Sequence, residues 1–388
     1  MRASLVAASF IFACSAPRAV DPLPFEPASP TSTPEPSKRG PFPVGVRTLT
    51  FEDTGRRKLD GTPRVLVTEV WYPAEQASRG GPGTTYDVLP IFTAEQQAAI
   101  GNATPLLETD AVRDAPVATT HGPFPLIMFS HGQAAVRWQS TYLTVLLASH
   151  GYVVASPDHE GGTLYDVVRG QLAGVTDGVD NRPLDIRYIV NRLSRLPAND
   201  PLAGMADTDN LGVAGHSFGA LTAMRVAVFD DRVKAIVPQA PVASDIAYVG
   251  HSNPPALPVM LQGAKLDRTL PYDENTVLSW EAMKRPRWLL TLETGGHFSF
   301  SDLCQFDLAS VADKVKLDIP GADVKKVLQD GCGGVAPPAS VALPMINHFT
   351  VAFFNAQLRG STASLELLTQ AKADGFGGAG VAAVRAEP

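Results

Sequence analysis

Three side chains with complementary chemistry occur in the second half of the chain, in the order Ser217, Asp267, His297. A serine hydroxyl becomes a strong nucleophile when a histidine takes its proton, and a carboxylate keeps that histidine correctly oriented. Ser217 lies in Gly215-His216-Ser217-Phe218-Gly219, a Gly-x-Ser-x-Gly motif. We therefore predict acyl transfer through Ser217, with His297 as the general base and Asp267 as the orienting acid.

The residues that flank Ser217 predict a sharp turn from a strand into a helix. An apolar run, residues 211–214, precedes the motif, and residues 220–226 are typical of a helix. In that setting the motif is a nucleophile elbow, whose glycines are needed because a side chain would collide with the neighbouring strand or helix. The alternative is a tight glycine-rich turn that buries a serine.

Asp267 and His297 each follow a predicted strand, over residues 258–263 and 287–292 respectively. The carboxyl ends of parallel strands meet at one edge of a sheet, which is where open α/β sheets bind ligands. Both loops can therefore converge on Ser217.

Other residues compete for these two roles. Asp273 and Glu274 lie slightly further along the loop of Asp267, and Asp302 lies beyond His297. The chain has 8 histidines, and any one of them is more often a surface or core residue than a catalytic one. His297 is preferred because its glycine-rich loop lets the ring reach back, whereas for Asp267 a surface carboxylate in a polar turn is the alternative.

An acyl-transfer site also needs two amide donors for the oxyanion. One is predicted to be the N–H of Phe218, which lies at a helix N-terminus with its partial positive charge. The other is predicted to be Gln133, because it follows a predicted strand, residues 124–130, and a glycine that lets the backbone approach closely. His131 is expected to brace this loop. The polar run 158–160 could rim the pocket, but a solvated loop is the preferred interpretation.

Strands and helices alternate along most of the chain, which predicts an α/β fold: a mostly parallel central sheet with helices on both faces. An N-terminal antiparallel hairpin, over residues 46–52 and 64–73, opens a single domain spanning residues 44–388. Residues 74–121 look irregular, apart from a helix around 93–101, and are expected to add nothing to the sheet core. The other strands are expected at 124–130, 151–157, 211–214, 234–238, 258–263 and, as the last, 287–292, and the other helices at 138–149, 182–196 and 220–226.

The N-terminus has the pattern of an export signal. Arg2 precedes an apolar run, residues 5–13, that is too short to span a membrane. Ile11-Phe12-Ala13-Cys14-Ser15 resembles the lipobox of bacterial lipoproteins, which implies that a signal peptide, residues 1–13, is removed and that Cys14 carries a lipid. Residues 14–43 are rich in Pro, Ser and Thr and are predicted to form an extended tether. Plain secretion and a misassigned start are the alternatives.

Cys304 and Cys332 remain once Cys14 is set aside, and in an exported protein we expect them to form a disulfide. No cluster of His and Cys in the sequence suggests a metal site. The formal net charge is −7 and no basic stripe is present, which argues against nucleic acid as a partner.

Several short motifs are spread between residues 44 and 354: Glu69-Val70-Trp71-Tyr72-Pro73-Ala74, Phe129-Ser130-His131-Gly132, Leu147-Ala148-Ser149-His150-Gly151-Tyr152-Val153-Val154, Asp185-Ile186-Arg187-Tyr188 and the Ser217 motif. In combination they resemble the α/β-hydrolase superfamily, and within it the platelet-activating-factor acetylhydrolase and dienelactone-hydrolase-like branch. The resemblance implies serine esterase chemistry on small or truncated acyl esters, with neither a metal nor an organic cofactor.

One position departs from the pattern of the animal acetylhydrolases, whose acid follows the strand immediately after the nucleophile helix. Here that position is near Gln239, and residues 237–241 contain no carboxylate. The departure favours Asp267, as in dienelactone hydrolases and bacterial polyester hydrolases, and it weakens a specific expectation of phospholipid as the substrate.

We therefore expect an exported serine carboxylesterase that acts on a small-molecule ester or lipid and meets a membrane only through a lipid anchor at Cys14. A peptidase or amidase of the same fold ranks lower, because esters are easier to cleave and no carboxylate for recognising an amine is evident. A non-catalytic surface-binding lipoprotein is the third hypothesis, which intact Ser217, Asp267 and His297 disfavour.

Overall fold

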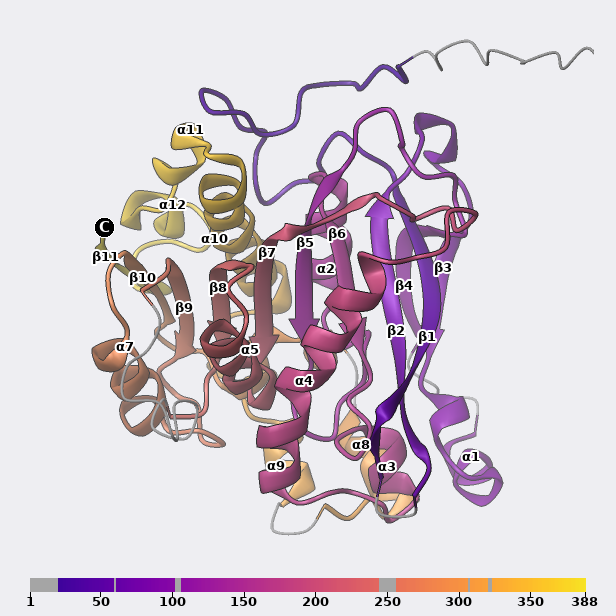
Figure 1. The fold of residues 1–388 in the computed structure, drawn as a ribbon. Helices are drawn as coiled ribbons and strands as arrows, with labels where there is room; N and C mark the ends of the chain where they lie inside the picture. The colour runs from indigo at the N-terminus through magenta and orange to yellow at the C-terminus, as the bar shows by residue number, and fades with distance from the viewer. Residues whose placement is uncertain (1–19, 59–60, 102–105, 244–255, 306–307, 320–322) are drawn as a thin grey trace, which may run out of the picture.

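One mixed sheet forms the centre of the protein (Figure 1). The computed structural model describes residues 20–388 except 59–60, 102–105, 244–255, 306–307 and 320–322. Within these residues the sheet has 11 strands in the order β11-β10-β9-β8-β7-β5-β6-β2-β1-β4-β3. Their bounds are β1 Val44–Arg57, β2 Pro63–Pro73, β3 Gly83–Asp87, β4 Leu106–Arg113, β5 Phe124–Ser130, β6 Val153–Pro157, β7 Ala206–His216, β8 Val233–Gln239, β9 Val259–Ala264, β10 Arg287–Leu292 and β11 Ala382–Glu387.

The predicted fold class is confirmed. Strands β5 to β10 are parallel neighbours, and β1 and β2 form the predicted antiparallel hairpin. The hairpin joins the parallel strands through an antiparallel pairing of β2 with β6. The helices are α1 Ala94–Ile100, α2 Thr141–Ser149, α3 Leu164–Val168, α4 Val175–Leu193, α5 Phe218–Phe229, α7 Leu278–Ala282, α8 Leu308–Val315, α9 Val324–Leu328, α10 Ala339–Arg359, α11 Thr362–Leu365 and α12 Gln370–Asp374.

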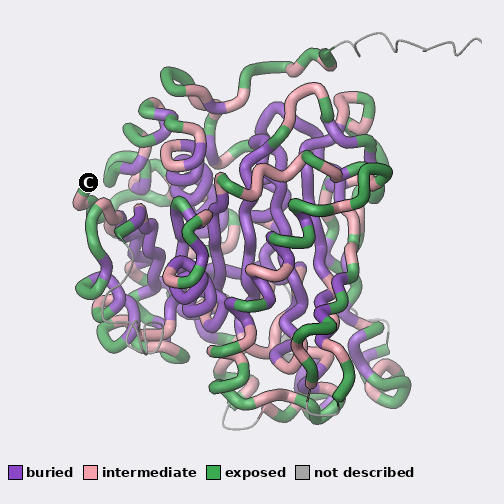
Figure 2. The backbone as a smooth tube through the Cα atoms, viewed as in Figure 1, coloured by how far each residue is buried: buried purple, intermediate pink, exposed green. Residues whose placement is uncertain are grey.

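Two hydrophobic cores, one on each face of the sheet, hold the layers together. Successive side chains of a strand point to opposite faces, so Leu126 and Met128 of β5 join the core under α4 and α5. Ile127 and Phe129 of the same strand join the core under α2 and α10. A strand buried on both faces needs a continuous apolar sequence, which is why residues 124–130 were recognisable from composition. Figure 2 shows these strands as the buried centre of the molecule.

The segment before β5 contributes more to the sheet than the sequence indicated. Strands β3 and β4 pair with each other, Tyr86 opposite Leu107, and β4 continues the sheet beside β1. The expectation that residues 74–121 add nothing to the sheet was therefore wrong. The prediction failed because apolar and polar residues alternate only weakly in this segment, and because β4 joins the sheet beside β1, which is distant in sequence. The helix expected around 93–101 is present as α1, which Thr93 caps.

The last strand also differs from the prediction. β11 closes one edge of the sheet, antiparallel to β10 with Leu290 opposite Val384, whereas residues 287–292 were predicted to be the final strand. A short edge strand that is partly exposed needs little apolar sequence, so residues 382–387 gave no strong signal.

The described part of the predicted tether, residues 20–43, lies against the domain. It is largely irregular, as expected, but Phe42 is buried and its N–H donates to the carbonyl of Ser149. Further toward the N-terminus, Thr362 N–H donates to Pro30 O, and Gln76 N–H donates to an Asp21 carboxylate oxygen. Much of this stretch is therefore a packed strap. The predicted signal peptide and Cys14 lie outside the described residues, and within those residues no helix has the length and apolar character needed to cross a membrane.

Candidate active site

Ser217 lies at the turn between β7 and α5, and its backbone has the unusual conformation of a sharp strand-to-helix turn. Its φ of 58° and ψ of −118° lie outside the regions that side-chain-bearing residues ordinarily occupy. A Cβ on Gly215 would lie 2.3 Å from the carbonyl oxygen of Gly219, and a Cβ on Gly219 would lie 1.8 Å from that of Ser130. The glycines of the motif are therefore steric necessities.

The loops after β9 and β10 bring Asp267 and His297 into contact. Nδ1 of His297 lies 2.8 Å from Oδ2 of Asp267, and both side chains are buried. The other carboxylate oxygen accepts hydrogen bonds from the N–H groups of Thr269 at 3.0 Å and Leu270 at 2.7 Å. The carboxylate is thereby fixed, and its contact with Nδ1 leaves Nε2 of His297 with the lone pair that a general base needs.

The rival carboxylates lie elsewhere. Asp273 and Glu274 are exposed, in a π-helical turn over residues Asp273–Val277. Asp302 is buried and accepts hydrogen bonds from Thr141 Oγ1 at 2.8 Å and Tyr142 N at 3.2 Å, at the start of α2. Burial raises the pKa of Asp302 to about 6. These hydrogen bonds indicate that Asp302 stabilises the start of α2.

The two backbone N–H groups that are predicted to bind an oxyanion are not hydrogen-bonded to other described residues of the protein. Neither the N–H of Gln133 nor that of Phe218 has an acceptor among the described residues. The loop of Gln133 lies directly against the elbow, because a Cβ on Gly132 would be 3.6 Å from Cβ of Ser217. Free donors from the oxyanion loop and from the start of α5 thus flank the serine.

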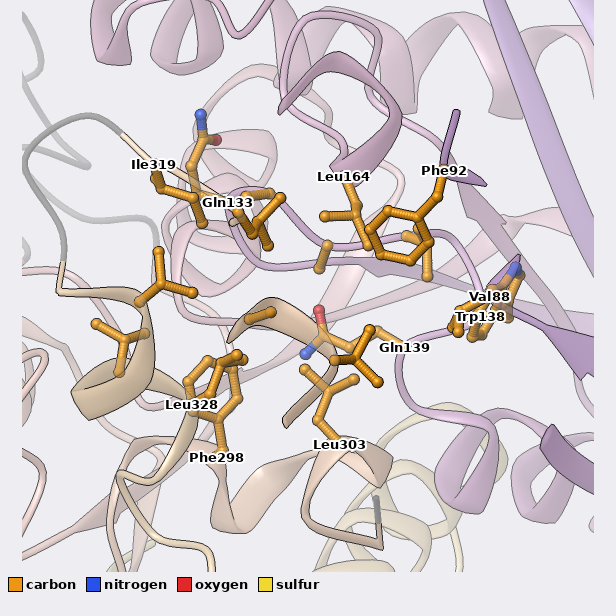
Figure 3. Close-up of a pocket in the computed structure, with 18 residues that line it drawn as sticks. Val88, Phe92, Gln133, Trp138, Gln139, Leu164, Phe298, Leu303, Ile319 and Leu328 are labelled. Carbon is orange, nitrogen blue, oxygen red and sulfur yellow. The ribbon is translucent and has the colours of Figure 1, made fainter. Parts of the chain in front are cut away.

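An apolar pocket opens beside this loop (Figure 3). Its cavity volume is about 120 Å³. Gln133 and Phe298, which neighbour the elbow and the histidine loop, both line it, and the remainder is mainly aliphatic and aromatic. The lining residues are Val88, Phe92, Gln133, Ala134, Ala135, Val136, Trp138, Gln139, Leu164, Phe298, Leu303, Val311, Ala312, Leu317, Ile319, Val324, Val327 and Leu328.

Two segments cover the pocket. Val88 and Phe92 come from the stretch before β5, so that stretch forms part of the pocket wall. The opposite wall comes from residues 303–328, which carry α8 and α9. Cys304 and Cys332 form a disulfide that closes this second segment into a loop, as the sequence predicted.

Comparison with known proteins gives a consistent assignment. The family model described as PET hydrolase-like matches residues 115–312, just over half of the chain. The chain belongs to the PET hydrolase-like family. The matched residues include Ser217, Asp267, His297 and Gln133. The model of platelet-activating factor acetylhydrolase, isoform II, matches residues 28–164.

A solved structure of ferulic acid esterase from Streptomyces cinnamoneus is also similar to this PET hydrolase-like protein. The TM-score is 0.61 at 25% sequence identity, and the alignment covers 89% of this chain and 97% of the esterase. Together with the family matches, the similarity supports an esterase-type hydrolase with an α/β-hydrolase fold.

A chain of hydrogen bonds that the sequence did not predict joins the three loops of this PET hydrolase-like site. Gly132 N–H donates to Oε1 of Gln139 at 2.8 Å, and Nε2 of Gln139 donates to Nδ1 of His216 at 2.8 Å. Nε2 of His216 in turn donates to the carbonyl of His297 at 2.9 Å. Burial lowers the pKa of His216 to about 3, so the ring is neutral and can accept at one nitrogen while donating at the other.

The polar run at 158–160 was expected in a solvated loop, and that expectation was wrong. Asp158 and His159 are buried, and the ring of His159 contacts Ser130 Oγ at 2.9 Å and Asp185 Oδ2 at 2.9 Å. His131 braces the oxyanion loop as predicted, because its Nε2 accepts a hydrogen bond from His159 N–H. The position of the run at the end of β6 was the one sequence signal for this network.

Proposed function

We propose that this protein is an exported serine carboxylesterase that uses Ser217, His297 and Asp267 as its catalytic residues. The observation that carries the proposal is the buried 2.8 Å contact between His297 Nδ1 and Asp267 Oδ2, at the same sheet edge as the strained elbow of Ser217. A histidine oriented by a fixed carboxylate, together with a serine held at a sharp strand-to-helix turn, is the arrangement that activates a hydroxyl nucleophile.

In the proposed reaction, His297 takes the proton of Ser217 as Oγ attacks the ester carbonyl. The N–H groups of Gln133 and Phe218 hold the negative oxygen of the tetrahedral intermediate. His297 then gives its proton to the leaving alcohol, and an acyl-enzyme remains on Ser217. Water, deprotonated by His297, attacks this acyl group, and collapse of the second intermediate releases the acid and restores the serine.

The apolar pocket beside Gln133 is proposed to take the acyl chain. An engineered protein cavity of about 150 Å³ holds one benzene molecule, so a pocket of about 120 Å³ suits a short chain of up to about six carbons. Burying each CH₂ contributes about 0.8 kcal/mol. We therefore expect kcat/KM to rise from acetate toward butyrate or hexanoate and to fall for longer chains that overfill the pocket.

The test is hydrolysis of a p-nitrophenyl ester series, from acetate to palmitate, by the full-length protein and by Ser217→Ala. The serine variant is expected to fold normally, to lose turnover and to lose labelling by a fluorophosphonate. Activity retained in Ser217→Ala would refute the assignment. A maximum at palmitate would leave the esterase chemistry standing and refute the small acyl pocket.

Export and lipidation are part of the same proposal and rest on the N-terminal sequence, in which Cys14 follows a short apolar run. Expressed in a bacterium, the protein is expected in the membrane fraction, and Cys14→Ser in the soluble exported fraction. An unprocessed N-terminus found by mass spectrometry would contradict this part of the proposal.

A further inference from the structure

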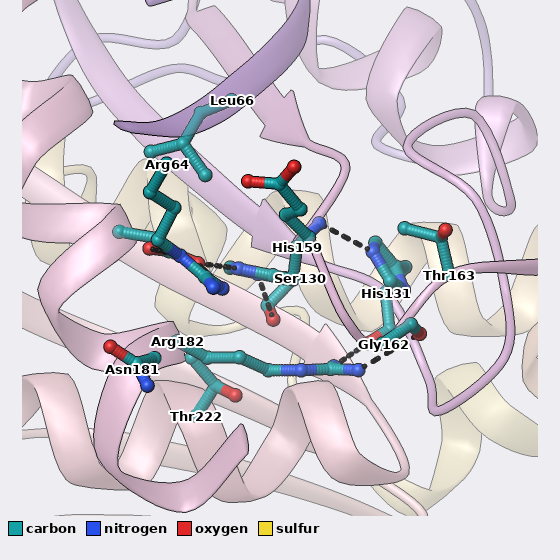
Figure 4. A network of polar contacts seen from close by, with 12 residues as sticks. Arg64, Leu66, Ser130, His131, His159, Gly162, Thr163, Asn181, Arg182 and Thr222 are labelled. Carbon is teal, nitrogen blue, oxygen red and sulfur yellow. Dashed lines mark hydrogen bonds and ion pairs between the residues drawn. The ribbon is translucent and has the colours of Figure 1, made fainter. Parts of the chain in front are cut away.

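Arg182 of α4 is a buried cation bound to the oxyanion loop (Figure 4). Its exposed fraction is 1%. Nη1 donates to the carbonyl of His131 at 2.7 Å, and Nη2 donates to Oε1 of Gln133 at 2.7 Å. Nη2 also lies 3.2 Å from the carbonyl of Gly162, so the guanidinium joins three points on two neighbouring loops. One of those points is the side chain of a predicted oxyanion donor.

The same guanidinium contacts the residue that supplies the second donor. Its central carbon lies 4.6 Å from the centre of the Phe218 ring, within the range of a cation–π contact. Gly178, one turn earlier on α4, makes room for that ring, because a Cβ there would lie 2.9 Å from it. Arg182 therefore contacts both residues that are proposed to supply the oxyanion donors.

The rest of the oxyanion loop is held just as firmly. Ser130 is bound to His159, His159 to Asp185, and Arg64 donates to Asp185 at 2.7 and 2.9 Å. Nδ1 of His131 donates to the carbonyl of the next residue. The loop is thereby tied at several polar groups, while the N–H of Gln133 has no acceptor among the described residues. Donors held in place before the reaction need no reorganisation as the oxyanion forms.

Asp185 and Asp166 attract the charge of Arg182 from a distance, but neither carboxylate is bonded to it. Across the described parts of the chain, no carboxylate lies within ion-pair distance of its guanidinium, and Nε has no hydrogen-bond partner. Burial lowers the pKa of Arg182 to about 9, which still leaves it charged at neutral pH. Burying a cation without a bonded anion is costly, and a negative charge that forms nearby during the reaction would be stabilised by it.

We propose that Arg182 is the positioning residue of the oxyanion hole: it fixes the Gln133 loop against Phe218 and adds a buried positive charge behind both amide donors. This inference rests on the proposed function, because it presumes that an oxyanion forms above Ser217. The inference predicts that Arg182 stabilises the tetrahedral intermediate far more than it stabilises the bound ester.

The experiment uses the full-length protein with Arg182→Gln, Arg182→Lys and the matched control Arg192→Gln, an exposed arginine on the same helix. Removing one direct oxyanion donor lowers kcat by about 100- to 1,000-fold in other enzymes. For Arg182→Gln we expect kcat to fall roughly 100-fold while KM changes less than about threefold. Lysine keeps the charge and lacks the forked donors, so an intermediate loss is expected. The control should match the unmodified protein.

A butylboronic acid inhibitor supplies the readout that a purely structural role would not move, because it forms a tetrahedral anion on the serine. Its affinity should fall by the same factor as kcat/KM across the variants. Gln133→Ala keeps the backbone N–H of residue 133 and removes the side-chain link to Arg182, together with part of the pocket wall. Because the two variants break the same link, the effect of Gln133→Ala on kcat should be less than additive with that of Arg182→Gln. If Arg182→Gln does not fold, Arg182→Lys and Gln133→Ala decide the question by the same two measurements.

Wild-type kcat in the Arg182 variants, or a loss confined to KM, would overturn the inference. The proposed function would be refuted by different results: an unmodified protein that hydrolyses no ester, or a Ser217→Ala variant that still hydrolyses esters. An active parent, an inactive Ser217→Ala and unaffected Arg182 variants would therefore reject this inference alone.

Discussion

Opening the disulfide between Cys304 and Cys332 is expected to damage the acyl pocket before it unfolds the protein. Most of one pocket wall, including Val311, Leu317 and Leu328, lies inside the loop that this disulfide closes. The loop also carries Asp330, whose carbonyl accepts from the N–H of Phe298, the residue after the proposed general base His297. Substrate selectivity and, to a smaller extent, the position of the histidine therefore depend on the closed loop.

The magnitude follows from the size of the loop. The two cysteines are 28 residues apart, and the chain-entropy relation gives a stabilisation of about 3.5 kcal/mol for such a loop at 25 °C. With an unfolding entropy of roughly 2.1 cal/mol/K per residue, losing it lowers Tm by roughly 5 °C for a domain of this size. The same energy shifts the equilibrium for opening the loop by up to about 400-fold.

The assay compares acetate and butyrate esters for the oxidised protein, the dithiothreitol-treated protein and Cys304→Ser/Cys332→Ser. Acetate places almost nothing in the pocket, so reduction should lower kcat/KM for butyrate by a larger factor than for acetate, mainly through KM. The double variant should behave like the reduced protein and be insensitive to dithiothreitol, which controls for Cys14. An unchanged butyrate-to-acetate ratio together with a Tm shift below about 1 °C would refute the reasoning.

Two further predictions concern the triad and acid stability. Asp267→Asn should lower kcat by about 1,000- to 10,000-fold with little change in KM, because the tautomer of His297 is no longer fixed. A loss of kcat smaller than tenfold in steady-state kinetics would contradict the proposed role of Asp267. Burial lowers the pKa of His159 to about 4 and of His216 to about 3 from an ordinary 6.5. Below pH 6.5 the unfolded chain therefore binds more protons than the folded one. Each histidine should lower the free energy of unfolding by up to about 1.4 kcal/mol per pH unit as the pH falls from 6.5 toward its folded-state pKa. Urea unfolding at pH 7.5, 6 and 5 measures this free energy, and a value that does not change with pH would contradict the prediction.

The central strands and the serine were predictable because their signals are local. Residues 124–130 form an uninterrupted apolar run, and Ser217 lies between two glycines at a strand-to-helix boundary. β4 and β11 were missed because their faces are partly exposed, and because each joins the sheet through a strand distant in sequence, β1 for β4 and β10 for β11. An edge strand is defined by the neighbour it pairs with more than by its own composition.

The supporting residues of the site were missed for a related reason. Arg182 reads as one more charged residue of a helix, yet its acceptor on Gln133 lies 49 positions away. His159 looked solvated because it stands between two acids, of which Asp158 binds Arg137 at 2.6 Å. A polar residue in a sequence does not reveal whether its partners will be water or other buried groups, and only the folded chain brings those partners together.

The surroundings of Gln239 give a physical reason why the proposed catalytic acid is Asp267 and not a residue at the end of β8. At the end of β8, the carbonyl of Gln239 accepts the N–H of Ser217, and its Nε2 donates to Oε1 of Gln262 at 2.9 Å. A carboxylate at residue 239 would set one buried oxygen against another and lose that donor. The loop after β9 instead offers two N–H groups to Asp267, which stabilise a buried negative charge. The acid therefore belongs one strand further along the sheet, where the backbone can pair with it.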